Sequence, residues 1–205
     1  MFASRVEAGR QLGEAIARLD LGATVVLGLP RGGIAVAAAV AERLGAPLGV
    51  LAVRKIGHPA SPEFGIGAVA YDGVMLLDPF ETGHVDAAWL DQAAQRERAE
   101  AERIQTRLQG NRAAVSVAGK AVVLVDDGIA TGWTVRAALH SVLARGPARV
   151  VVAAPVAAEG TARQIEAEGA TVVALVRPAA GFAVGQFYRD FRQVSEDEAA
   201  ELLGA

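Results

Sequence analysis

The chain has 205 residues and a mass of 21.1 kDa, with 52% hydrophobic and 21% charged residues. This composition excludes intrinsic disorder, and the length fits one large domain with a sizeable buried core. The formal net charge of −3 argues against a protein whose main task is to coat nucleic acid. Cysteine is absent, which excludes disulfides, thiolate catalysis and cysteine-based zinc sites.

The sequence also lacks signals for a membrane span or a structural metal. Its longest apolar runs stay well below the roughly 18 residues that a membrane span needs. Charged residues at positions 5, 7 and 10 precede any apolar run, so no signal peptide is expected. The three histidines, His58, His84 and His140, show no helical metal-ligand spacing. We therefore expect a soluble, cytoplasmic protein with neither a membrane nor a nucleic-acid partner.

Short apolar runs alternate with helical patterns along most of the chain. The runs predict β-strands over residues 24–27, 48–53, 121–125, 149–153 and 171–176. Periodic segments between them predict helices over residues 34–44, 134–144 and 161–168. Continuously apolar strands that alternate with helices indicate a parallel sheet buried on both faces. The expected fold is a single α/β domain over residues 1–205, doubly wound and Rossmann-like, with its ligand beyond the carboxyl ends of the strands.

Residues 54–77 interrupt this alternation. Glycine, proline and histidine residues over 54–67 predict a long mobile loop. A hairpin is expected directly after it, with strands over residues 68–70 and 74–77 and a turn at Tyr71-Asp72-Gly73.

Residues 86–109 are a second interruption, an insertion that predicts a long charged helix. Its apolar positions form only a narrow stripe, made of Leu90, Ala94, Ala101, Ile104 and Leu108. Such a stripe indicates a solvated amphipathic helix that either lies across the domain or contacts a second copy of the chain. A homodimer through this helix is therefore one expectation.

The most informative stretch runs from the predicted strand at 121–125 into the next helix. Two carboxylates, Asp126 and Asp127, end the strand, and a loop rich in glycine and threonine opens the helix. The members of that loop are Gly128, Ile129, Ala130, Thr131, Gly132, Trp133 and Thr134. Such a loop turns backbone N–H groups inward, and the helix N-terminus adds donors and partial positive charge. The pattern predicts a site for a terminal phosphate beside two carboxylates that need a cationic or hydroxyl-rich neighbour.

Two common phosphate motifs do not match this loop, because it lacks both the lysine of a Walker A motif and the G-x-G-x-x-G spacing of a dinucleotide fold. Four apolar residues, two acids and G-I-A-T-G-x-T instead resemble the phosphoribosyl-pyrophosphate (PRPP) signature of type I phosphoribosyltransferases. In that family the two acids contact the ribose 2′ and 3′ hydroxyls and the loop holds the 5′-phosphate. The resemblance gives these roles to Asp126, Asp127 and residues 128–134. Trp133 departs from the family's small or polar residue, and its side chain either flanks the phosphate or points to solvent.

The end of the first predicted strand carries a second part of the resemblance. Pro30, Arg31, Gly32 and Gly33 form a tight turn that leads into a helix, so its first N–H groups face an anion. The turn is similar to the family's pyrophosphate loop. The resemblance therefore implies that Arg31 contacts the diphosphate.

Arg54 and Lys55 follow the second predicted strand and resemble the start of the family's mobile catalytic loop. Paired cations suit a diphosphate leaving group, and closure of such a loop excludes water from the reaction. His58 and Glu63 in the same loop are acid–base candidates, with simple exposure to solvent as the alternative.

The segment 177–194 resembles the hood of purine-type phosphoribosyltransferases, in which an aromatic residue stacks on the base. The resemblance makes Phe182 the stacking residue and Val184 a source of backbone contacts to the base. Arg189 falls nearer the place of the family's acid, and Asp190 comes one residue later, which weighs against a purine acceptor. The aromatic residues could equally form a small satellite core.

Together these motifs imply a pentosyl transferase of nucleotide metabolism that moves a 5-phosphoribosyl group from PRPP to a nitrogen nucleophile such as a nucleobase and releases pyrophosphate. The implied catalytic residues are Asp126, Asp127, Arg54 and Lys55. Mg²⁺ is expected to be held mainly by substrate and water, with Asp126 and Asp127 as the protein's own candidate ligands. One alternative is a regulatory PRPP-binding protein without transferase activity. A more remote one is a hydrolase or phosphorylase that acts on a phosphorylated sugar.

Overall fold

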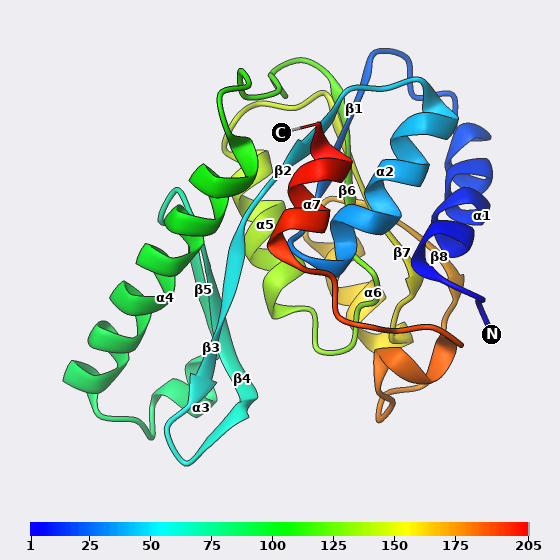
Figure 1. Ribbon diagram of the computed structural model, residues 1–205. Coiled ribbons are helices and arrows are strands. Elements are labelled where there is room, and N and C mark those ends of the chain that lie inside the picture. Colours follow the sequence, from blue (N-terminus) through cyan, green and yellow to red (C-terminus); the bar gives the residue numbers. More distant parts are fainter. Residues whose placement is uncertain (205) are drawn as a thin grey trace.

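A five-stranded parallel sheet forms the centre of the computed structural model, which describes residues 1–204 (Figure 1). Its strands, in spatial order, are β2 (Leu48–Val50), β1 (Thr24–Gly28), β6 (Ala121–Val125), β7 (Arg149–Val156) and β8 (Thr171–Val176). All four neighbouring pairs in this sheet are parallel. The predicted parallel sheet is therefore confirmed.

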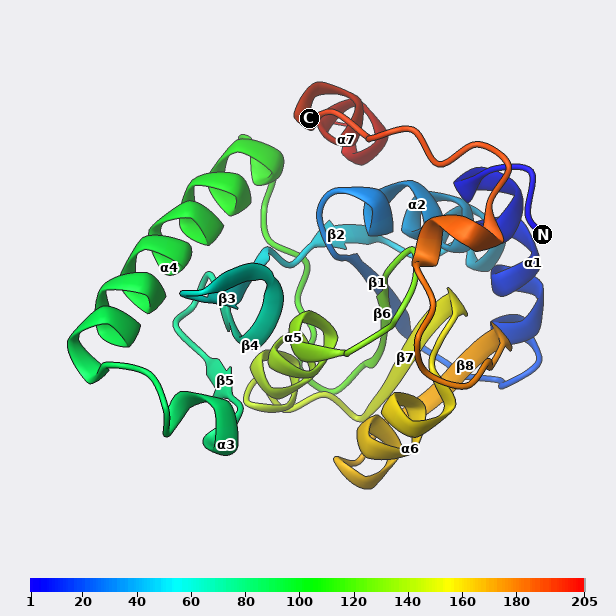
Figure 2. The same cartoon turned by 90° about the horizontal axis from the view of Figure 1, so that it is seen from below.

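Helices cover both faces of this sheet (Figure 2). Helices α1 (Arg5–Ala17) and α2 (Gly32–Leu44) pack on one face, and α5 (Trp133–Leu143) and α6 (Glu159–Ala167) pack on the other. Successive side chains of a strand point to opposite faces, so an apolar strand supplies both cores. The doubly wound α/β fold is confirmed.

The carboxyl ends of β1 and β6 lie side by side, with Gly28 paired to Val125. The chain leaves β1 toward a helix on one face and leaves β6 toward a helix on the other. Two adjacent strands with connections of opposite direction open a crevice between their loops, and ligands of doubly wound sheets bind there. The topology therefore places a ligand site between the segments that follow Gly28 and Val125.

A smaller antiparallel sheet stands beside the main one. It consists of β3 (Val53–His58), β4 (Ser61–Ala70) and β5 (Met75–Leu77), and α3 (Pro79–Thr82) follows it. Helix α4 (Ala87–Gln109) covers one face of this sheet through Ala93 and neighbouring apolar residues. Ala68 and Ala70 on β4 join the core around α5 instead. The predicted charged helix is confirmed, and its narrow apolar stripe packs on the smaller sheet and on the edge of the main sheet.

The prediction of a loop over residues 54–67 is wrong, because most of this segment belongs to β3 and β4. The pairing of these strands shifts register on both sides of Gly57. Glycine and proline, which usually interrupt strands, here accompany a bulged hairpin. The hairpin that follows is confirmed, since the N–H of Ala70 donates to the carbonyl of Val74 across the predicted turn.

The strand predicted over residues 48–53 is also divided, since β2 ends at Val50 and β3 begins at Val53. A side chain from α4 explains the break. The amide of Gln105 accepts a 2.8 Å hydrogen bond from the N–H of Ala52 and donates one of 3.2 Å to the carbonyl of Val50. Because these two backbone groups are bonded to a side chain, the chain can leave one sheet and enter the other without burying unpaired polar groups.

Both termini add structure around the carboxyl edge of the main sheet. A 3₁₀ turn, η1 (Val184–Phe187), lies in the segment 177–194, and α7 (Glu196–Leu203) packs on α2 and α4. Helix α7 begins with a capping box between Ser195 and Glu198. No helix of the described residues is both long and apolar enough to cross a membrane.

Candidate phosphate and ribose site

Asp126 and Asp127 lie where β6 ends, beside the turn that follows β1. The N–H of Leu29 donates to the carbonyl of Val125 at 2.9 Å, which keeps the two strand ends together. The Pro30–Arg31 peptide bond in that turn is cis. The two segments that the sequence singled out most strongly are thus direct neighbours in space.

Glycine allows this close approach. A β-carbon on Gly32 would overlap the Oδ2 atom of Asp127. A β-carbon on Gly33 would lie 2.8 Å from the carbonyl oxygen of Val125 and 3.0 Å from Oδ1 of Asp126. These separations are too short for any side chain, so the glycines place the backbone of one loop against the acids of the other.

Each of the two carboxylates has one oxygen held by the protein. Oδ1 of Asp126 accepts a 2.8 Å hydrogen bond from the N–H of Asp127, and Oδ2 of Asp127 accepts one of 2.8 Å from Nε of Arg5. Within residues 1–204, no hydrogen bond reaches Oδ2 of Asp126 or Oδ1 of Asp127. The pair therefore presents two anchored carboxylates with one acceptor oxygen each for a ligand.

Burial raises the pKa of Asp126 well above its ordinary value, and the charge of Asp127 raises it further. Burial also raises the pKa of Asp127, but the guanidinium of Arg5 opposes this effect. The arginine thus favours the ionised form of Asp127 and leaves Asp126 as the acid that more readily holds a proton. Two adjacent carboxylates with different environments suit a ligand that brings hydroxyl groups or a cation.

The loop after these acids leads into α5. The N–H of Ile129 donates to the carbonyl of Val156 at 2.8 Å and is therefore not available to a ligand. Gly132 has φ +80°, a left-handed conformation that glycine adopts without strain, and no side chain caps the helix that follows. The hydroxyl of Thr161 donates to the carbonyl of Ala130 at 2.7 Å and fixes the loop from outside. Thr131 is exposed. An uncapped helix N-terminus with an exposed threonine is a suitable anion site.

Arg31 and Arg54 line one cavity of about 320 Å³ beside the turn after β1. Arg54 also donates to Glu97 on α4 at 3.1 Å, whereas the Arg31 side chain makes no hydrogen bond or ion pair within the described residues. Glu100 and Glu196 line the same cavity. The structure therefore brings the two arginines together, in surroundings that also contain acids.

Lys55 is not part of this cavity lining. Its ammonium donates to the carbonyl of Glu63 at 2.9 Å and lies 3.5 Å from the carboxylate of the same residue, within the hairpin itself. The imidazole of His58 accepts a hydrogen bond from the N–H of Ala60 at the hairpin turn. None of these hairpin side chains contacts Asp126 or Asp127 in this structure.

The expectation that the Trp133 side chain points to solvent is wrong, and its place beside a phosphate stays a prediction. The half-buried ring packs against the core around α5, and a β-carbon on Gly65 of β4 would lie 3.5 Å from its Cδ1 atom. The guanidinium carbon of Arg136 lies 5.2 Å from the ring centre. The tryptophan therefore joins α5 to the smaller sheet. This contact needs a large side chain, at a position where the family has a small or polar residue.

The segment 177–194 contacts the loop at 128–134 beside the carboxyl edge of the main sheet. The side chain of Val184 packs directly on the backbone of Gly128. Phe182 is half-buried and stands edge-to-face to Phe187, with ring centres 5.2 Å apart. Tyr188 is buried, and its hydroxyl donates to the carbonyl of Asp127 at 2.6 Å. Of the two predicted base-binding residues, Val184 thus lies against the phosphate loop and Phe182 lies against Phe187. Part of this segment also forms a small core with Phe2.

Two contributors to the site were not among the predicted site residues, Arg5 and Tyr188. Both reach Asp127 from distant parts of the chain, 122 and 61 residues away. The only sequence signal for Arg5 is its place at the start of an amphipathic segment, which many surface arginines share.

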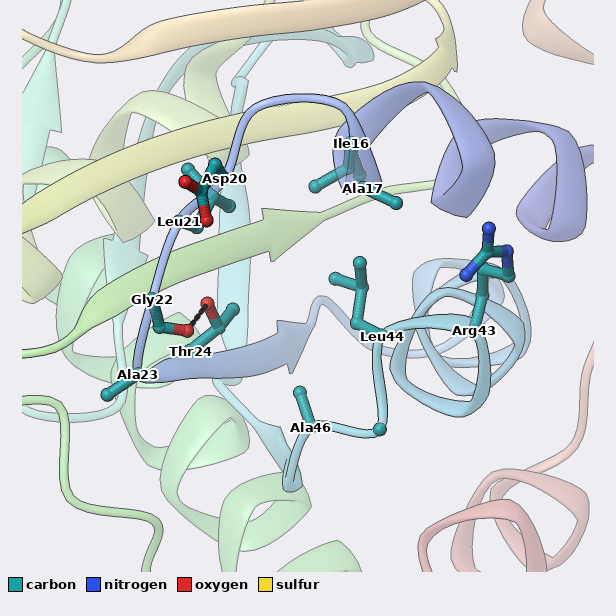
Figure 3. A pocket seen from close by; sticks show the side chains of 11 residues that line it. Ile16, Ala17, Asp20, Leu21, Gly22, Ala23, Thr24, Arg43, Leu44 and Ala46 are labelled. Atoms are coloured by element: carbon teal, nitrogen blue, oxygen red, sulfur yellow. Dashed lines mark hydrogen bonds between the residues drawn. The ribbon is translucent and has the colours of Figure 1, made fainter.

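A second cavity, of about 500 Å³, lies at the opposite edge of the main sheet (Figure 3). It is formed where α1 ends, where α2 turns into β2, and where β1 begins. Asp20 and Arg43 are its only charged lining residues, and none of the predicted site residues lines it. Since ligands of doubly wound sheets bind at the carboxyl edge, the strand-end site and not this cavity is the candidate functional site.

A doubly wound sheet with paired acids, a glycine turn and an uncapped helix N-terminus at adjacent strand ends is the arrangement expected of an α/β domain that binds a phosphorylated ligand. The chain belongs to the phosphoribosyl transferase domain family, whose model matches residues 6–185. This match covers both strand-end loops and the first half of the hood, and it confirms the family resemblance.

Known proteins similar to this chain agree with that assignment. Two Mycobacterium tuberculosis proteins, named "Putative phosphoribosyl transferase" in strains H37Rv and CDC 1551, are each 43% identical over 205 residues. The alignments cover 99% of this chain but only 46% of each relative, so the chain spans about half the length of these curated relatives.

One solved structure matches nearly all of the given chain. The crystal structure of TT1426 from Thermus thermophilus has a TM-score of 0.83 and 44% identity, with 99% of this chain and 97% of that chain covered. The AQ2163 protein from Aquifex aeolicus, at 16% identity and a TM-score of 0.56, shares the fold over 86% of this chain and 74% of its own.

Proposed function

We propose that this chain transfers a 5-phosphoribosyl group from PRPP to a nitrogen nucleophile, a nucleobase or a similar planar molecule, and releases pyrophosphate. The observation that carries the proposal is the contact between the two strand-end loops. It sets the carboxylates of Asp126 and Asp127, each with one oxygen that the protein leaves without a hydrogen bond, against a glycine turn and at the start of the loop that leads to an uncapped helix N-terminus. A ribose that carries phosphate groups at both ends matches this order of groups.

In this proposal the loop at 128–134 binds the 5′-phosphate and the two aspartates accept hydrogen bonds from the ribose hydroxyls. The turn at 30–33 and Arg31 bind the diphosphate, and Arg54 lines the same cavity. The bond between the anomeric carbon and the diphosphate oxygen breaks with its electron pair on oxygen, and the nitrogen lone pair forms the new bond and then loses its proton. Positive charge develops on the sugar ring, so the nearby carboxylates lower the barrier electrostatically.

Mg²⁺ fits the donor set as a metal held mainly by its substrate. This ion keeps several waters and takes one or two protein carboxylates together with phosphate oxygens. Among residues 1–204, no group of three or more side chains could hold a metal ion by itself. Asp126 and Asp127 would be its protein ligands, and the bound ion would neutralise charge on the leaving diphosphate.

The acceptor is proposed to lie under the hood, against Phe182 and the backbone near Val184. Phe182 keeps part of its ring exposed while Phe187 supports its edge, an arrangement suited to stacking on a planar base. The cytoplasmic location and the homodimer through α4 stay predictions. The same is true of Lys55 as a catalytic residue, which would have to leave its contact with Glu63.

Calorimetric titration tests the proposal first. Purified protein is titrated with PRPP, ribose 5-phosphate and pyrophosphate in Mg²⁺, and pyrophosphate release is then followed with a panel of bases. Micromolar PRPP binding and release that depends on an added base support transfer. PRPP binding without release for any base would favour the regulatory alternative, and release of ribose 5-phosphate without a base would favour a hydrolase. No binding of any ligand at millimolar concentration would overturn the proposal.

A further inference from the structure

Arg5 contacts the proposed ribose site although the family resemblance gives it no role. Its Nε atom donates to Oδ2 of Asp127 at 2.8 Å, and Nη1 donates to the carbonyl oxygen of Arg192 at 2.8 Å. The guanidinium carbon lies 3.9 Å from the centre of the Phe191 ring. Only 10% of the Arg5 side chain is exposed. An arginine that is bonded, stacked and buried in this way is fixed in one position.

The chain around Arg5 is joined to the hood by backbone hydrogen bonds. The N–H of Phe2 donates to the carbonyl of Phe187 at 2.7 Å, and the N–H of Arg189 donates back to the carbonyl of Phe2 at 2.8 Å. The N–H of Asp190 donates to the carbonyl of Ala3 at 3.1 Å. Figure 1 and Figure 2 both show the N-terminal segment beside the stretch that carries η1. The beginning of the chain, the hood and Asp127 therefore form one connected unit.

We infer that Arg5 is a positioning residue for the proposed transfer: it fixes one oxygen of Asp127 and directs the other toward the ribose. This inference rests on the proposed function and deepens it. Through Phe191 and the carbonyl of Arg192, the same side chain makes the hood part of the support for the ribose acid. A base bound under the hood and a ribose bound at Asp127 would thus be held relative to each other by Arg5.

The contact between Arg5 and Asp127 also affects the pKa of the acid. Burial raises the pKa of Asp127, and the guanidinium of Arg5 is the main opposing influence. Tyr188 donates to the backbone of Asp127 rather than to its carboxylate, and burial raises the pKa of this phenol above its ordinary value. Among the described residues, Arg5 is therefore the only cation bonded to the acid pair. Without it, Asp127 would lose its fixed orientation.

The test compares Arg5→Met and Arg5→Lys with Arg10→Met, a matched control that removes an exposed arginine from the same helix. PRPP affinity is measured by calorimetry at pH 7, after circular dichroism has shown that each variant is folded. A lost hydrogen bond to a charged group predicts about tenfold weaker PRPP binding for Arg5→Met. Arg5→Lys should recover most of the affinity, because an ammonium can still donate to Asp127, and Arg10→Met should bind like the wild type.

Equal affinity of Arg5→Met and the wild type would overturn the positioning role. A deficit that Arg5→Lys does not relieve would also overturn it, because a purely structural role predicts that result. If Arg5→Met does not fold, Phe191→Leu and Arg5→Lys carry the test in the same titrations. Failure of the proposed function is recognised separately, since the wild type would then bind neither PRPP nor ribose 5-phosphate.

Discussion

The backbone of Gly32 touches the side chain of Asp127, so closely that a β-carbon on the glycine would overlap Oδ2, the carboxylate oxygen that Arg5 binds. This contact joins the turn after β1 to the end of β6. A side chain at position 32 would therefore displace Asp127, which is proposed to bind the ribose.

Replacing Gly32 by alanine should remove most of the transferase activity. The new methyl group pushes Asp127 away from its position, and a displacement of about 1 Å at a reacting centre can lower turnover by ~10²-fold. The measurement is pyrophosphate release at saturating PRPP. Gly160→Ala is the control, because nothing lies within 4 Å of a β-carbon at that position in α6. Wild-type turnover of Gly32→Ala would show that the reaction does not take place at this contact.

Asp126→Asn should make the protein more stable at neutral pH while it loses activity. Burial raises the pKa of Asp126 above its ordinary value of 3.8, so the folded state binds a proton more tightly than the unfolded state does. Wild-type stability therefore falls as the pH rises above about 4, and the asparagine avoids this loss. The melting temperature of the variant should match the wild type near pH 4 and exceed it at pH 7, by ~2–4 °C for each kcal/mol.

Glu14→Gln is the control for this comparison, since it neutralises an exposed acid on α1. The melting temperature of Glu14→Gln should change between pH 4 and pH 7 by the same amount as that of the wild type. A melting temperature of Asp126→Asn below the wild type at both pH values would mean that Asp126 is stabilising as a carboxylate, contrary to this reasoning.

The centre of the fold could be predicted because its signals are local. β6 has the predicted bounds since an unbroken apolar run stands between Lys120 and Asp126, and both faces of the sheet accept such a run. The long helix α4 was predicted for a similar reason, with Asp86 as its N-cap. The two strand-end loops were recognised by composition, and the parallel order of the strands then brings their ends to one edge.

What could not be predicted depends on contacts between distant residues. The division of the expected strand at 48–53 depends on Gln105, which lies 53 residues from Ala52 and belongs to a different element. The anchoring of Asp127 depends on Arg5, 122 residues earlier. Helices α1 and α7 are absent from the predicted elements, and the glycine and proline residues of β3 and β4 gave the pattern of a loop. Tertiary pairing overrides local preference in such segments.

Two substitutions should separate the two phosphate ends of the substrate. Thr131→Ala should weaken the binding of ribose 5-phosphate and of PRPP by about tenfold and leave pyrophosphate binding unchanged, because the Thr131 hydroxyl is on the loop that opens α5. Arg31→Gln should weaken the binding of pyrophosphate and of PRPP by a similar factor and leave ribose 5-phosphate binding unchanged. Calorimetry with all three ligands gives the pattern directly.

Thr106→Ala and Arg10→Gln are matched controls, since both residues are exposed, neither lines the cavity of Arg31, and neither bonds to the two acids. Both should bind all three ligands like the wild type. If Thr131→Ala instead weakens pyrophosphate alone, or Arg31→Gln weakens ribose 5-phosphate alone, the orientation of PRPP in the proposed site is reversed.

The last prediction concerns Gln105, which lets the chain pass from the main sheet to the smaller one. Gln105→Leu removes the acceptor for the N–H of Ala52 and the donor to the carbonyl of Val50, both of them buried. A buried polar group left without a partner costs about 1–3 kcal/mol, so the variant should lose roughly 2–5 kcal/mol of unfolding free energy in urea. Gln92→Leu replaces an exposed residue on the same helix and should change the unfolding free energy by less than about 0.5 kcal/mol. The ribose 5-phosphate affinity of folded Gln105→Leu should stay near the wild type, because the strand-end loops do not contact this residue. A stability equal to the wild type would mean that water replaces the amide, and the division between β2 and β3 would then need another cause.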